Sequence, residues 1–215
     1  MKENLFICKI MKNHINSIFF AVLFIFNSDY TLCQTIKTGI YNWGTMCIVA
    51  DNSTGKITGY YENYSGLDEQ AQQFSFSCIF LFSGNMSNGQ KKFPILSYAY
   101  DGSDTISGEI IIESDTKIRI YLQREHGKCS QVEKFSEKIS PIFQITEEKN
   151  WKGIAAVKTE KAFFHTAPDE ARKSSRVVSK GSFVKILEEK DTWLKVEFQS
   201  GDSIINAWLK KSDLF

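Results

Sequence analysis

Cysteine and histidine are the residue types best suited to chemistry in this 215-residue chain, and both are sparse: five cysteines and three histidines. A nucleophilic cysteine needs a histidine base that is held by a further polar group, and a zinc amidase site needs at least two histidines near one another. Cys47 and Cys78 lie in apolar segments, where a thiolate is disfavoured, and His126 is the one histidine between positions 34 and 150. The sequence contains no C-x-x-C pair and no glycine-rich phosphate loop. We therefore predict that the protein is not an enzyme and carries no metal or other cofactor.

The first 33 residues have the pattern of a secretory signal peptide. Residues 15–26 form an apolar run that follows Lys12 and precedes polar residues. A membrane-spanning helix needs roughly 20 apolar residues, so this shorter run fits the central part of a signal peptide better. Met11 is a better start than Met1 because Lys12 then supplies the positive end, and we expect cleavage near Cys33. A membrane anchor and a lipid attached to Cys33 are the alternatives.

Export would place the remaining cysteines in an oxidising compartment, where disulfides form. Cleavage leaves Cys47, Cys78 and Cys129, which allow three pairings that sequence alone does not distinguish. Cys78 lies on the phenylalanine face of an alternating segment, and Cys129 follows a turn, so a bond between them is sterically easy. We therefore prefer the disulfide Cys78–Cys129, with Cys47 as a buried thiol.

Residues 34–150 are predicted to form short strands. Apolar and polar residues alternate in segments rich in β-branched and aromatic residues, and turn-forming residues separate the segments. Helical spacing of apolar residues is not found in any 11-residue window. Seven or eight antiparallel strands of this kind predict an all-β fold, with a closed barrel or a sandwich. The expected strands cover 39–50, 56–64, 74–82, 94–100, 106–113, 117–123 and 139–146.

Three short patterns in these segments are similar to small lipocalin-like or calycin-like barrels. They are Gly39-x-Tyr41, Gly59-Tyr60-Tyr61 and Phe76-x-Cys78-x-Phe80. This resemblance implies a cavity that holds a small apolar ligand. The residues also support a second interpretation, in which the phenylalanines fill the barrel because side chains pack the interiors of small barrels. The four phenylalanines concerned are Phe74, Phe76, Phe80 and Phe82.

Residues 151–215 carry a sharper pattern of five spaced elements. The elements are residues 155–168 ending in His165-Thr166-Ala167-Pro168, the turn Lys180-Gly181, the segments 183–187 and 193–198, and Trp208. This order resembles the bacterial SH3 (SH3b) domain, and the resemblance implies a small SH3-like barrel that binds cell-wall peptides or other proteins. The chain departs from the family in the loop ending at Pro168, where an Arg-Ser-Gly-Pro-like loop is usual, and at Ala207, where glycine is usual.

Phe163, His165 and Trp193 are the predicted binding residues of this module. If Ala162 and Phe164 point inward, strand alternation turns Phe163 and His165 outward, and Trp193 follows the hairpin tip nearby. Exposed aromatic residues surrounded by polar ones mark binding surfaces. In the alternative, Phe163 packs on the preceding domain and Trp193 packs on its own hairpin.

These patterns together predict an exported binding protein of bacterial type, in the periplasm, at the cell surface or outside the cell. We expect a leader (1–33), an antiparallel β-barrel (34–150) and an SH3-like domain (151–215), with no transmembrane segment after cleavage. Lys and Arg total 26 against 25 Asp and Glu, so nucleic acid is not an expected partner. The expected partner is a protein or a cell-wall peptide. A carrier of a small apolar ligand, or an inhibitor or immunity protein, is the alternative, and a filled barrel would argue against the carrier.

Overall fold

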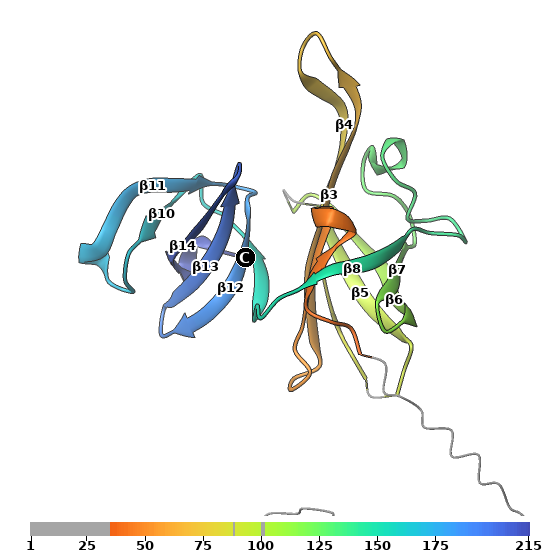
Figure 1. Cartoon of the computed structure of the whole chain (residues 1–215), viewed down its shortest axis with the longest axis horizontal. Helices are drawn as coiled ribbons and strands as arrows, with labels where there is room; N and C mark the ends of the chain where they lie inside the picture. Colours follow the sequence, from red (N-terminus) through yellow and green to blue (C-terminus); the bar gives the residue numbers. More distant parts are fainter. Residues whose placement is uncertain (1–34, 88, 100–101) are drawn as a thin grey trace, which may run out of the picture. The chain divides into compact units, whose positions relative to one another are not determined.

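The protein is built from a barrel and a smaller sheet, both made of β-strands. The computed structural model describes residues 35–87, 89–99 and 102–215, so the predicted leader and its cleavage site lie outside the described residues. Eight antiparallel strands close into a barrel in chain order, with β8 paired to β1, and six further strands form a smaller sheet (Figure 1). The predicted all-β fold with a closed barrel is confirmed. The barrel strands are β1 (Gly39–Tyr41), β2 (Met46–Ala50), β3 (Lys56–Asp68), β4 (Gln73–Asn85), β5 (Lys92–Ala99), β6 (Thr105–Ser114), β7 (Lys117–Leu122) and β8 (Ile142–Glu148).

Aromatic side chains fill the barrel interior. The ring centroid of Tyr61 lies 5.4 Å from that of Phe80, 4.9 Å from that of Phe135 and 5.7 Å from that of Phe143. Phe80 and Phe82 are buried as predicted, whereas Phe74 is exposed and Phe76 only half-buried. That part of the prediction is wrong because β4 continues past the end of the barrel.

The segment 123–141 between β7 and β8, here called the plug, inserts Phe135 into the end of the barrel. Glu125 holds the plug in shape: its carboxylate accepts hydrogen bonds from the backbone N–H groups of Phe135 (2.9 Å) and Ser136 (2.8 Å). The disulfide Cys78–Cys129 joins the plug to β4, which confirms the predicted pairing. Cys47 is a buried free thiol, as predicted.

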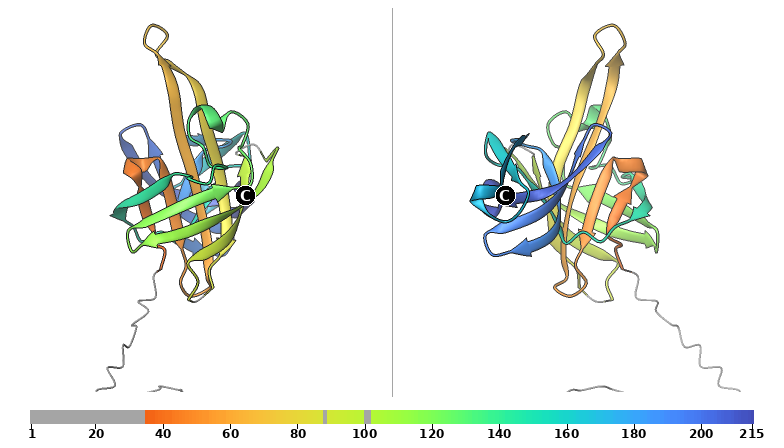
Figure 2. Two further views of the ribbon diagram at one scale, coloured as in Figure 1. Left: turned by 90° about the vertical axis from the view of Figure 1, so that its right-hand side faces the viewer. Right: turned by 60° about the vertical axis from the view of Figure 1, so that its left-hand side comes forward.

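Strands β3 and β4 extend beyond the barrel as a two-stranded hairpin, which rises above the other barrel strands in Figures 1 and 2. Their barrel neighbours pair with them only at the base: β2 reaches Tyr61 of β3, and β5 reaches Phe80 of β4 among the described residues. We call the extension, Glu62–Ile79, the arm.

The smaller sheet buries a second apolar core made of alternating residues. Val184, Val196 and Leu209 are fully buried in it, and Phe164 packs beside them. Both sheets belong to one compact unit, in which Tyr60 of the barrel stacks on Phe183 of the smaller sheet with ring centroids 4.5 Å apart. The strands, in the order β11-β10-β14-β13-β12-β9, are β9 (Gly153–Ala156), β10 (Lys161–His165), β11 (Lys173–Ser179), β12 (Phe183–Lys190), β13 (Trp193–Ser200) and β14 (Ser203–Lys210).

Candidate recognition cleft

Two loops of the smaller sheet flank a cleft whose wall includes Trp193. The first loop follows β10, and its Asp169 carboxylate caps a single 3₁₀ turn (Glu170–Arg172) by accepting a hydrogen bond from the N–H of Ala171 (3.0 Å). The second is the two-residue tip between β12 and β13, in which Asp191 adopts a left-handed φ of 49°. Aspartate tolerates this conformation because its short side chain can bond locally. The sequence therefore builds both walls from residues suited to tight turns.

Of the three predicted binding residues, the structure brings His165 and Trp193 together. Their rings meet edge to face with centroids 4.6 Å apart. The prediction that both point outward is wrong, because His165 is 2% and Trp193 8% exposed. A register shift in the pairing of β10 with β11, between Phe163 and His165, breaks the alternation on which the prediction rested, so Phe164 and His165 are both buried.

Phe163 lies apart from this pair. It is half-buried, does not line the cleft, and its ring is covered by the Lys173 ammonium, whose Nζ lies 3.5 Å from the ring centroid. That geometry is a cation–π contact, in which Lys173 occupies the ring face that a ligand would otherwise contact. The three predicted residues therefore do not form one outward surface: His165 and Trp193 are buried together, and Phe163 lies apart from them.

The cleft beside Trp193 has a volume of about 570 Å³. Lys210 lies over the Trp193 ring, with its Nζ 5.9 Å from the centroid, and forms an ion pair with Glu170 across the cleft mouth. His165 supports the floor, since its Nδ1 lies 3.0 Å from the carbonyl oxygen of Asp169, which can only accept a hydrogen bond. We call this cleft the Trp193 cleft. It is lined by Pro168, Asp169, Glu170, Asp191, Thr192, Trp193, Lys210, Lys211 and Ser212.

Charges of both signs line the rim of the cleft. The carboxylate of Glu170 raises the pKa of Lys210, and Lys211 lowers the pKa of Glu189 by hydrogen bonding to it. These groups are exposed, so water and salt screen them strongly. The cleft thus offers one aromatic wall, hydroxyl groups and paired charges. That set suits a peptide-like ligand with alternating polar and apolar groups, and it supplies no nucleophile paired with a base.

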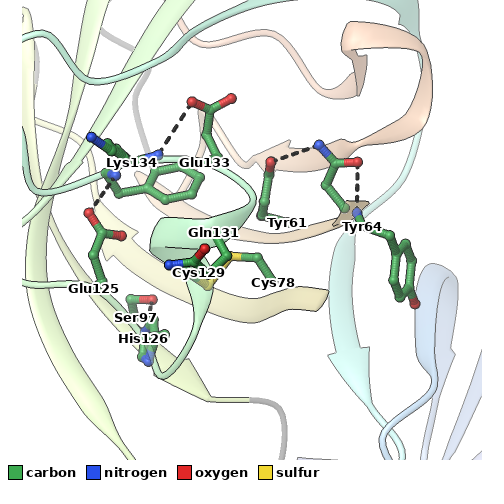
Figure 3. The surroundings of a disulfide bond; sticks show 12 residues. Tyr61, Tyr64, Cys78, Ser97, Glu125, His126, Cys129, Gln131, Glu133 and Lys134 are labelled. Atoms are coloured by element: carbon green, nitrogen blue, oxygen red, sulfur yellow. Dashed lines mark hydrogen bonds between the residues drawn. A yellow bond between two sulfur atoms is a disulfide. The ribbon is translucent and has the colours of Figure 1, made fainter. Parts of the chain in front are cut away.

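A second cluster lies at the plug end of the barrel and was not expected from the sequence. Ser97 Oγ lies 2.7 Å from His126 Nε2 (Figure 3), and His126 Nδ1 lies 3.5 Å from an Asp104 carboxylate oxygen. Arg124 binds the same carboxylate with two hydrogen bonds (2.8 and 2.5 Å) and lowers its pKa. Burial lowers the pKa of His126, while Asp104 opposes this effect. The order matches that of a hydrolase triad, but Ser97 is fully buried, so a substrate has no path to its hydroxyl in this conformation.

Within the described ranges, no group of three or more histidine, cysteine or carboxylate side chains is placed to hold a metal ion. None of the helices in that part of the chain is long and apolar enough to cross a membrane. Comparisons with models of known protein families, with curated proteins and with solved structures find no match for this chain.

Proposed function

We propose that this protein is an exported, non-enzymatic binding protein that recognises a peptide of the cell wall or of another protein through the Trp193 cleft. The observation that carries the proposal is the meeting of the loop after β10 and the β12–β13 tip around Trp193, which leaves an open, partly aromatic cleft. The sequence resemblance to SH3b domains supports the same region of the chain as the recognition module.

The filled barrel argues against the carrier alternative. Small-ligand sites are apolar cavities of roughly 300–1,000 Å³ that enclose most of the ligand. Here the interior is occupied by packed aromatic rings, including Phe135 from the plug. A barrel of this kind serves better as a rigid support than as a container.

Two features support export. The disulfide Cys78–Cys129 needs an oxidising compartment to form and persist. The apolar run at 15–26 has the length of the apolar central region of a signal peptide. N-terminal sequencing of the protein secreted by its native host should begin near Gln34, and an intact leader on that protein would contradict export.

The recognition proposal is tested by removing the ion pair at the cleft mouth. The double variant Glu170→Ala/Lys210→Ala changes the rim of the cleft without opening the core. Glu160→Ala/Lys180→Ala removes a matched exposed pair that lies just before β10 and just after β11. Sedimentation with purified peptidoglycan and pull-down of envelope proteins measure binding. We expect the first variant to lose binding and the second to retain it. Equal behaviour of both variants would overturn the assignment to this cleft.

A further inference from the structure

The arm is a two-stranded ribbon that is braced only at its base. An isolated two-stranded hairpin is marginally stable in water, so a projecting one needs support. The disulfide ties Cys78 of β4 to Cys129 of the plug (Figure 3), and Ser65 Oγ of β3 donates a hydrogen bond to the Gln131 carbonyl oxygen (2.8 Å). Beyond these braces, the Asp68 carboxylate closes the tip turn by accepting hydrogen bonds from two backbone N–H groups. The arm is thus tied to the plug at Cys78 and Ser65 and closed at its tip by Asp68.

Apolar side chains lie exposed on this arm. Tyr64, Leu67 and Phe74 are 40%, 51% and 53% exposed, and the Tyr64 and Phe74 ring centroids lie 5.4 Å apart. Grouped exposed apolar residues mark interaction surfaces, whereas single ones do not. Folding alone does not explain these residues, because they contribute little to the buried core.

One edge of the arm faces a cleft. Among the described residues, β5 pairs with β4 only over Phe80–Gly84, so the stretch Gln73–Ser77 has a strand neighbour on its β3 side alone. A cleft of about 500 Å³ runs beside this edge, from Ser75 and Phe76 to Gly127 and Lys128 of the plug. An unpaired strand edge with a cleft beside it is the arrangement to which extended peptides add as a further strand.

The charge of the arm selects among possible occupants. Residues 62–79 contain three carboxylates, Glu62, Asp68 and Glu69, and no lysine or arginine. Pairing two copies of the arm would bring like charges together, and an anionic membrane surface would also repel it. The cleft itself is lined by one carboxylate, Asp104, and one ammonium group, Lys128, so the three carboxylates of the arm decide the sign of the surface and attract a segment that carries lysine or arginine.

We propose that the arm binds an extended, basic segment of a partner protein, which adds as a strand to the edge Gln73–Ser77 and packs apolar side chains against Phe74 and the cleft. This surface lies outside the Trp193 cleft, so the inference stands or fails independently of the proposed function.

The probe is a decapeptide of alternating lysine and valine, with an alternating glutamate–valine peptide for comparison. Fluorescence anisotropy measures affinity, and hydrogen exchange with mass spectrometry reports which backbone amides become protected. Glu69→Lys and Phe74→Ser alter the charge and the apolar contact of the arm. Asp115→Lys, at the turn between β6 and β7, and Ile204→Ser, an exposed residue of β14, are the matched controls.

We expect the basic peptide to bind about tenfold tighter than the acidic one and to slow exchange within Gln73–Ser77. Glu69→Lys should weaken binding by about threefold, Phe74→Ser should weaken it further, and the two controls should leave it unchanged. Equal affinity for both peptides, or protection confined to residues outside the arm, would overturn the inference. Two further results would also overturn it. A doubled mass of the free protein that Phe74→Ser abolishes would assign the surface to self-association, and protection of the arm by phosphatidylcholine vesicles would assign it to lipid.

Discussion

Removal of the disulfide should cost this protein a large part of its stability. Cys78 and Cys129 are separated by 51 positions, and both are buried. Closing a loop of this length lowers the chain entropy of the unfolded state by an amount equivalent to about 4 kcal/mol at 25 °C. The double variant Cys78→Ala/Cys129→Ala should therefore lose about 4 kcal/mol of unfolding free energy. For a domain of this size, that loss lowers the melting temperature by about 8–16 °C.

Urea denaturation followed by tryptophan fluorescence measures the loss, provided that a second probe shows the same transition. Cys47→Ala is the control, because it removes a buried thiol that donates a hydrogen bond to the Tyr60 hydroxyl (3.3 Å) but closes no loop. We expect the control to cost about 1 kcal/mol. A loss below about 1 kcal/mol for the double variant, or equal losses in the two proteins, would refute the reasoning from loop entropy.

Three further predictions concern buried side chains. Trp193→Ala should lower the free energy of unfolding by about 3–5 kcal/mol in urea denaturation, because it opens a cavity beside His165. An unchanged melting temperature would contradict the burial of Trp193. Phe135→Ala should cost a similar amount, and faster hydrogen exchange in the plug should accompany it, whereas unaltered exchange would show that the plug does not depend on this ring. Burial lowers the pKa of His126 in the folded state, so the unfolded state binds a proton first as the pH falls, and stability should decrease below a pH of about 6.5. His126→Gln should flatten this part of the stability–pH curve, and an unchanged slope would contradict the assignment.

Local alternation of residues predicted the approximate places of the barrel strands and favoured the disulfide that the structure holds, although three cysteine pairings stayed open and the expected strand 39–50 is divided into β1 and β2 by a 3₁₀ turn. Side chains in a strand point to opposite faces in turn, so a period of two can be read directly from one segment. Ile110 and Ile112 of β6 and Ile118 and Ile120 of β7 follow this rule and face the barrel interior. The same rule placed Cys78 on the buried face of β4, where Cys129 reaches it.

The positions of the side chains around the Trp193 cleft depended on a register shift between strands, which the alternation of residues along one strand does not reveal. A single register shift in β10 turned His165 into the core, although the residues on either side gave no signal of it. Such bulges arise from the fit between neighbouring strands, so they are decided when the sheet assembles. The outward position predicted for His165 failed for this reason, whereas Trp193 lies on β13 and is buried by contacts that include His165 and Lys210. The proximity of His165 and Trp193 was predicted correctly.

Tertiary structure alone decided how the barrel is closed and which groups meet there. Ser97, Asp104 and His126 come from β5, from the connection between β5 and β6, and from the plug. The pairing of β5, β6 and β7, together with the path of the plug after β7, brings them together. The length of the arm was equally hidden, because Phe74 and Phe80 alternate in the same way although only Phe80 has a barrel around it. Alternation along the chain determined which residues could share a face of a strand, whereas long-range pairing determined which of those faces became buried, because burial depends on neighbours that are distant in sequence.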